Sequence, residues 1–251
     1  MIRSFMIFPA VFIVSLLQAQ DITLDTILHR HFRAVGGQEH WQQMKTCYAE
    51  QSYWAIPIYM PPHKRFLGDQ LPKSKKLYYQ HPDQYRMNIY REEEPSTAFV
   101  VRQSDAKLYS YPAKHEEPLP ERMKEVMARD FSLYLFGLTP LILSAYEDKS
   151  LAYEGKSEAY EKICYKLVIT NGDLLEGRTF IYLDAETYRV HAFAHADDIN
   201  KHKIYENYRS VDGLMLAHKI SSYHQGERYE EYTIDKIEIN QPLPPNLFTV
   251  W

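Results

Sequence analysis

The last third of the chain, residues 162–240, alternates between apolar and polar positions in short segments separated by turn sequences. A period of two is the pattern of a β-strand, and Asp212-Gly213 and Gln225-Gly226 stand where tight turns would connect such strands. Strands joined by short connections pair with their neighbours in antiparallel order. The pattern therefore predicts an antiparallel meander, with strands at residues 163–170, 178–183, 188–195, 204–208, 214–223 and 229–239.

Further alternating segments precede the meander, at residues 47–54, 76–80, 84–91, 98–103 and 107–111. In the third of these segments, Tyr85, Met87 and Ile89 fall on one face. An antiparallel sheet commonly buries one face against the rest of the protein and leaves the other in contact with solvent. We therefore expect the remaining segments to cover one face of a single sheet, in one domain that spans residues 21–251.

Two regions instead have the helical period of about 3.6 residues. Residues 23–35 place apolar side chains on one face, Thr23 stands at the N-cap position, and Gly36-Gly37 ends the segment. Residues 118–146 form an apolar helical insert between strands, with Thr139-Pro140 at the start of its second helix. This insert is either a plug that completes the core or a lid over an apolar cavity, and the pattern favours neither.

Composition and the N-terminus narrow the class of protein. The chain has 251 residues, of which 45% are hydrophobic, so it can form a substantial core, and its formal net charge of −4 argues against general nucleic-acid binding. Residues 1–20 combine Arg3, an apolar run and small or polar residues before Asp21, as in a secretory signal peptide. The apolar run is shorter than the ~20 residues of a membrane-spanning helix. We therefore expect export and a periplasmic location.

Two further features leave alternatives open. Cys47 and Cys164 could pair in an oxidising compartment, or they could be two small buried residues on different strands. Residues 55–72 are rich in proline and also contain large apolar side chains. This segment is either a long loop packed against the sheet edge or a functional loop that contacts a membrane or a hydrophobic partner.

The sequence contains no recognisable catalytic motif. It lacks the Gly-x-Ser-x-Gly, His-Glu-x-x-His and phosphate-binding glycine patterns. His191 and His195 lie near Asp197 and Asp198, but two residues four positions apart on a strand are separated by ~13 Å, too far for one metal ion. We therefore expect a binding protein that is not an enzyme and that has no metal or other cofactor.

Several short motifs resemble those of one known family. Residues 81–87 are similar to the proline, turn and arginine strand of the periplasmic lipoprotein-carrier (LolA-like) proteins, and residues 104–112 are similar to the hairpin that follows it. Residues 237–248 resemble the last strand and closing phenylalanine of the family. Gly36-Gly37 followed by Trp41 is similar to the start of Bacteroidota relatives in outer-membrane lipoprotein sorting. The order of helix, strands, helical insert and closing meander is also that of the family.

The resemblance implies an α+β fold, a half-open antiparallel β-barrel made from one large curved sheet with helices covering its concave face. It also implies a non-catalytic carrier of lipoprotein acyl chains or other lipids, with an apolar cavity under a helical lid. Arg86 becomes the candidate for the arginine that holds this lid in the family. The ligand-binding residues expected on this basis are Tyr85, Met87, Ile89, Phe99, Phe131, Leu135, Leu138, Leu141, Phe180 and Tyr182.

The expected partner is a hydrophobic or acylated ligand, lipoproteins included, and nucleic acid is not expected. We also expect a monomer that makes transient contact with a membrane or membrane protein through residues 55–72. Two alternatives stay open. In the first, the helices fill the barrel and the protein is a periplasmic scaffold for protein–protein interaction. In the second, it is a secreted hydrolase, which would need a nucleophile or a carboxylate pair beside a histidine.

Overall fold

The computed structural model describes residues 22–56, 73–102, 105–113, 115–120, 122–170 and 177–249. The expected signal peptide and most of the proline-rich segment, residues 57–72, lie outside the described residues. Within the described ranges, no helix has the length and apolar character that crossing a membrane would require.

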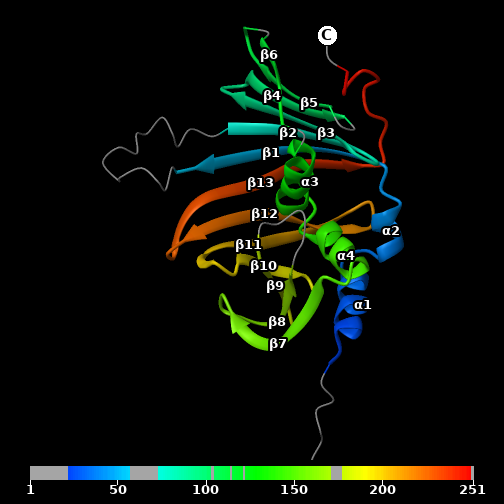
Figure 1. The fold of residues 1–251 in the computed structure, drawn as a ribbon, viewed down its shortest axis with the longest axis vertical. Helices are drawn as coiled ribbons and strands as arrows, with labels where there is room; N and C mark the ends of the chain where they lie inside the picture. The colour runs from blue at the N-terminus through cyan, green and yellow to red at the C-terminus, as the bar shows by residue number, and fades with distance from the viewer. Residues whose placement is uncertain are drawn as a thin grey trace, which may run out of the picture.

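The strands of the described chain form one curved antiparallel sheet of 13 strands, in the order β6-β5-β4-β3-β2-β1-β13-β12-β11-β10-β9-β8-β7 (Figure 1). Pairing of β1 with β13 joins the N-terminal half of the sheet to the C-terminal half. The strands are β1 (Thr46–Ala55), β2 (Lys73–Gln80), β3 (Gln84–Arg91), β4 (Glu94–Arg102), β5 (Asp105–Ser110), β6 (His115–Pro118), β7 (Leu151–Ala159), β8 (Lys162–Ile169), β9 (Thr179–Asp184), β10 (Val190–His195), β11 (Asp198–Val211), β12 (Leu214–His224) and β13 (Glu227–Ile239).

The predicted meander is confirmed as strands β8 to β13, each paired with the next in antiparallel order. Its Asp-Gly turn behaves as the sequence indicates, because Asp212 and Gly213 have φ angles of 47° and 78°. Two central residues with positive φ define the type I′ turn, whose twist matches that of the flanking strands. Gln225 and Gly226, with φ angles of 53° and 83°, connect β12 to β13 in the same way.

The two edge strands, β6 and β7, were not predicted. Every residue of β6 is exposed, and most residues of β7 are exposed or half-buried. A strand with little burial on either face has no need for apolar residues at alternate positions, so the sequence carries no period-two signal there.

The helices of the described chain are α1 (Leu24–Ala34), α2 (Gln38–Gln42), α3 (Met123–Tyr134) and α4 (Thr139–Glu147). Helix α1 begins as predicted, since the Thr23 hydroxyl accepts a hydrogen bond from the Thr26 backbone N–H at 3.2 Å. Helix α4 begins one position earlier than predicted. Its N-cap is Leu138, and Thr139 is its first helical residue. Leu138 has a left-handed φ of 66°, which allows the tight turn between α3 and α4.

Helices α1, α3 and α4 pack against one face of the sheet through two adjoining apolar clusters. One cluster joins α1 and α4 to strands β7 to β13, and the other joins α2 and α3 to strands β1 to β5 and β12 to β13. Helix α3 contributes Leu133 to the first cluster and Phe131 to the second. The two clusters therefore meet beneath α3, which lies across the strands at the middle of the sheet (Figure 1).

Cys47 and Cys164 are both free and buried, so the disulfide alternative is wrong. Cys47 lies on β1 and packs in the cluster beneath α3, whereas Cys164 lies on β8 and packs in a cluster with Phe180 and Ala192. Strands β13, β12, β11, β10 and β9 separate β1 from β8 in the sheet. The two cysteines are the small buried residues on different strands that the second alternative describes.

Candidate binding site beneath the central helices

Five of the predicted ligand-binding residues meet in the apolar cluster beneath α3. Tyr85, Met87 and Phe99 reach this cluster from strands β3 and β4, while Phe131 and Leu135 reach it from α3 and its C-terminal end. The rings of Tyr85 and Phe131 meet edge to face, with their centroids 5.2 Å apart. The structure therefore brings these five side chains together at one place between helix and sheet.

Three further predicted residues lie on the same side of the sheet. Leu138 and Leu141 belong to the neighbouring cluster between α1, α4 and the C-terminal strands. Ile89 is half-buried and follows Met87 at the alternate position along β3, on the same face. These three residues border the cluster beneath α3.

Phe180 and Tyr182 lie on the opposite face of the sheet. They pack with Cys164, Ala192 and other residues in a separate cluster, while their neighbours Ile181 and Leu183 face helices α1 and α4. The sequence pattern showed the alternation correctly but did not show which set of β9 side chains faces the helices. Every residue of β9 is buried, so polarity does not distinguish its two faces. The structure does not bring Phe180 and Tyr182 to the other eight residues.

A cavity of about 210 Å³ lies between α2, the start of α4, α3 and strands β2 and β3. Tyr85 and Leu141 are the predicted ligand-binding residues among those that line it. The lining residues that the sequence did not identify as ligand-binding are Trp41, Met44, Tyr79, Ala128, Ser132, Phe136, Pro140 and Leu143. None of the lining residues carries a charged side chain at neutral pH, so the cavity suits an uncharged, largely apolar group.

Aromatic side chains form the wall of this cavity. The ring of Phe136 meets those of Tyr79 and Trp41 edge to face, with centroid distances of 5.8 Å and 6.2 Å. Burial raises the pKa of Tyr79 to about 12 and raises the pKa of Tyr85 as well. Both phenols therefore stay neutral at physiological pH. They neither repel an anionic ligand nor attract it by charge.

The C-terminal end of α3 is held to the sheet by hydrogen bonds. The Tyr205 hydroxyl donates to the Leu133 carbonyl at 3.1 Å, and the Gln51 amide donates to the Tyr134 carbonyl at 2.5 Å. The Lys203 ammonium donates to the Tyr134 hydroxyl at 2.8 Å. These contacts satisfy carbonyls that the end of a helix leaves free and fix this end in place.

The N-terminal end of α3 is held much less firmly. Its N-cap residue, Arg122, makes no side-chain capping hydrogen bond. The Lys124 ammonium lies 2.6 Å from the Asp83 carboxylate in the turn between β2 and β3, but these side chains are 37% and 41% exposed. An ion pair this exposed contributes about 0–1 kcal/mol, so the two ends of α3 are anchored unequally.

A buried group of charges lies on the other side of α3 from the cavity. The Lys203 ammonium is 3.5 Å from the Glu230 carboxylate, and both side chains are largely buried. Burial lowers the pKa of Lys203 and lowers that of Lys75 to about 8, and burial raises the pKa of Asp130 on α3. The Lys75 ammonium lies 4.3 Å from the centre of the Tyr53 ring. Cations and carboxylates balance each other here, so the arrangement serves to position α3.

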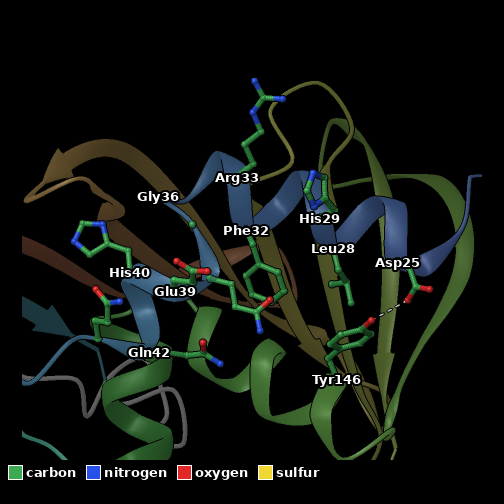
Figure 2. Close-up of a pocket in the computed structure, with 13 residues that line it drawn as sticks. Asp25, Leu28, His29, Phe32, Arg33, Gly36, Glu39, His40, Gln42 and Tyr146 are labelled. Atoms are coloured by element: carbon green, nitrogen blue, oxygen red, sulfur yellow. Dashed lines mark hydrogen bonds between the residues drawn. The ribbon is translucent and has the colours of Figure 1, made fainter.

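A larger groove of about 860 Å³ is lined by residues of α1 and α2 and by Tyr146 of α4 (Figure 2). Asp25, Arg33 and Glu39 give it charges of both signs, and the Tyr146 hydroxyl donates a hydrogen bond to the Asp25 carboxylate at 3.0 Å. Figure 2 shows the polar side chains along its rim. A groove with this mixed polar lining does not suit an acyl chain, so its greater volume does not make it the better candidate.

Arg86 does not occupy the position of a lid-holding arginine. It alternates with Tyr85 and Met87 along β3 and so points away from the helices. Its guanidinium donates to the Leu247 carbonyl at 2.6 Å and to the Asn88 side chain at 2.8 Å. Arg86 therefore holds the C-terminal segment against the outer face of the sheet.

The histidines near the C-terminal strands do not form a metal centre. Among the described residues, no three His, Cys, Asp or Glu side chains are grouped as metal ligands would be. His191 Nε2 lies 3.0 Å from the Tyr160 carbonyl, and the His202 ring stacks on Tyr160 with a centroid distance of 4.0 Å. These contacts give both histidines a structural role.

No protein-family model matches the chain, and no curated protein matches it. The solved structures that resemble its fold include three with TM-scores above 0.5. An outer-membrane lipoprotein-sorting protein domain from Vibrio parahaemolyticus is 14% identical, with a TM-score of 0.55 over 89% of this chain and 94% of that chain. A DUF1329 family protein from Desulfovibrio piger is 13% identical, with a TM-score of 0.57 over 89% of this chain and 96% of that chain. A LolA superfamily protein from Nitrosomonas europaea is 12% identical, with a TM-score of 0.55 over 91% of this chain and 98% of that chain. The fold is therefore LolA-like.

Proposed function

We propose that the protein is a non-catalytic periplasmic carrier or binding protein for an acylated ligand, either the acyl chains of a lipoprotein or another lipid. The ligand enters the cavity between the sheet and helices α3 and α4, and α3 acts as its lid. The face that the helices contact is then the concave face of a half-open barrel. Two of the similar structures are named for lipoprotein sorting and for the LolA superfamily, which accords with this role.

The uncharged aromatic cavity beneath α3 is the observation that carries the proposal. Each methylene group that moves from water into an apolar site contributes about 0.8 kcal/mol. An acyl chain therefore binds such a site without any catalytic group, and its affinity increases with the length that is buried.

The small size of the cavity supports the proposal that α3 moves when a ligand binds. Its volume of about 210 Å³ is below the ~300–1,000 Å³ of most small-molecule sites. The exposed ion pair at Lys124 and the uncapped Arg122 allow the N-terminal end of α3 to swing outward while the end at Tyr134 stays fixed. Met123 and Met127 lie in the swinging half, and methionine adapts its shape to different neighbours.

The proposal includes the segments outside the described residues. Residues 1–20 serve as the signal peptide, and residues 55–72 contact a membrane or a membrane protein during transfer of the ligand. The carrier works as a monomer on this view, because the ligand lies between elements of one chain.

Native mass spectrometry of the protein purified from a periplasm tests the proposal. We expect a population whose mass exceeds that of the chain by an acylated molecule, and gentle activation should release that molecule. A single species of the bare chain's mass, unchanged after incubation with acylated lipids, would contradict the proposal.

The filled-barrel scaffold is the second candidate function. It is favoured by the packing of α3 and α4, since Phe131 is 2% exposed and Leu135, Leu138 and Ile142 are not exposed at all. Under this alternative the helices complete the core and do not move. Hydrogen exchange separates the two functions, because a lid exposes its N-terminal amides far more often than the sheet unfolds, whereas a plug protects them equally.

A further inference from the structure

Ser132 is a polar residue in an otherwise apolar position. It lies near the C-terminal end of α3, is 4% exposed and lines the cavity beneath this helix. Its hydroxyl has no hydrogen-bond partner among the described residues. A serine within a helix can bond to the carbonyl four residues before it, which here would be that of Ala128, but the Ser132 hydroxyl does not do so.

A buried hydroxyl without a partner destabilises the folded protein, so its presence requires an explanation. Alanine at this position would fit the helix better, since alanine has the highest helix propensity and buries no polar group. The serine gains a partner only if a hydrogen-bonding group enters the cavity. Ser132 lines the cavity while its oxygen is covered, and rotation about the Cα–Cβ bond would turn the hydroxyl toward a group that enters.

The other lining residues define the chemical class of that group. The polar atoms of the cavity belong to neutral groups, and the Tyr79 hydroxyl lies 3.3 Å from His81 Nδ1. Without a cation among the lining residues, a free carboxylate would lose its hydration and gain no counter-charge. An ester or amide carbonyl accepts a hydrogen bond and carries no charge, so it fits the Ser132 hydroxyl.

We infer that the Ser132 hydroxyl donates a hydrogen bond to the carbonyl oxygen of an acyl chain in ester or amide linkage. This inference rests on the proposed carrier function and specifies its ligand: a neutral acyl ester or amide, in preference to a free fatty acid. The chain occupies the aromatic part of the cavity around Phe136, and its carbonyl lies beside α3.

Competition binding with two matched ligands tests the inference. A fluorescent acyl probe is displaced from the full mature chain by a medium-chain acyl methyl ester or by an alkyl ether of equal length, and the same titrations are made with Ser132→Ala. We expect the variant to bind the ester three- to tenfold more weakly, as the loss of one neutral hydrogen bond predicts. Affinity for the ether, which lacks the carbonyl, should not change.

Thermal stability supplies an independent readout. Ser132→Ala should raise the melting temperature of the unliganded protein, because it removes an unpaired buried hydroxyl. The matched control is Thr179→Val, which removes another buried hydroxyl without a partner in the described chain and keeps the side-chain shape. Thr179 lies on β9 and does not line the cavity, so this variant should also gain stability but should bind the ester as the wild type does.

The outcomes separate the inference from the function on which it rests. Equal affinity of wild type and Ser132→Ala for the ester would overturn the inference and leave the carrier function intact. A lower melting temperature for Ser132→Ala would also overturn it, because the hydroxyl would already have a partner. Failure of both ligands and of the probe to bind the wild type would overturn the carrier function itself.

Discussion

At the scale of single residues, one fully buried titratable group has a structural role. His31 on α1 is not exposed to solvent, and its Nδ1 donates to the Tyr188 carbonyl at 2.8 Å. Burial lowers the pKa of His31 to about 4. The structure therefore places His31 among the buried residues of α1.

This lowered pKa makes stability depend on pH. Above pH 6.5, His31 is neutral in both states; as the pH falls from 6.5 towards 4, the unfolded chain gains a proton that the folded chain does not, so stability is lost. At pH 5 the loss due to His31 is about 2 kcal/mol. Chemical denaturation at pH 7 and pH 5 should show a smaller difference between the two pH values for His31→Asn than for the wild type.

Burial also lowers the pKa values of His202 and His218. Part of the pH dependence of stability therefore remains in the His31→Asn variant. An identical pH difference in wild type and His31→Asn would show that His31 does not contribute. The absolute stability of the variant is not the readout, since replacing a buried side chain has its own cost.

At the scale of elements, the unequal anchoring of α3 predicts how the lid opens. Asp83→Asn removes the ion pair with Lys124 that holds its N-terminal end. Because the pair is exposed, stability should fall by less than about 1 kcal/mol, while the association rate of an acyl probe should rise severalfold. Stopped-flow fluorescence measures this rate.

The matched control for this prediction is Glu116→Gln, which removes an exposed ion pair of the same length, 2.6 Å, between Lys107 on β5 and Glu116 on β6. This pair lies at the edge of the sheet, so the control should leave the association rate unchanged. Equal association rates for Asp83→Asn and the wild type would mean that α3 does not limit entry.

The sequence predicted the elements that bury at least one face and missed β6 and β7, which bury little on either face. The meander could be predicted because its strands alternate, and the helical insert could be predicted because Met123, Val126 and Met127 change the period. The cavity could not be predicted in full, because α2 and α3 meet there only in the folded chain. Trp41 stands out in the sequence through the family resemblance, but nothing there shows that it lines a cavity with Ser132 and Phe136.

At the scale of the whole molecule, the two halves of the sheet are joined by β1 and β13. These strands pair in antiparallel register from Cys47 opposite Ile239 to Ala55 opposite Glu230. The clusters on the helix side also meet beneath α3, and the cluster that contains Phe131 takes residues from both halves of the sheet. We therefore expect a single cooperative unfolding transition in calorimetry, and two separate transitions would show that the halves are independent domains.

The account as a whole depends on an acyl chain entering the cavity beneath α3. Ala128 lines this cavity from the helix, and Ala128→Leu fills it with a side chain of high helix propensity. The most direct measurement is equilibrium titration of wild type and Ala128→Leu with a fluorescent acyl probe, beside their melting temperatures. We expect saturable binding by the wild type and at least tenfold weaker binding by the variant, about 1.4 kcal/mol, without loss of stability. Equal binding by both proteins, or none by the wild type, would contradict the account.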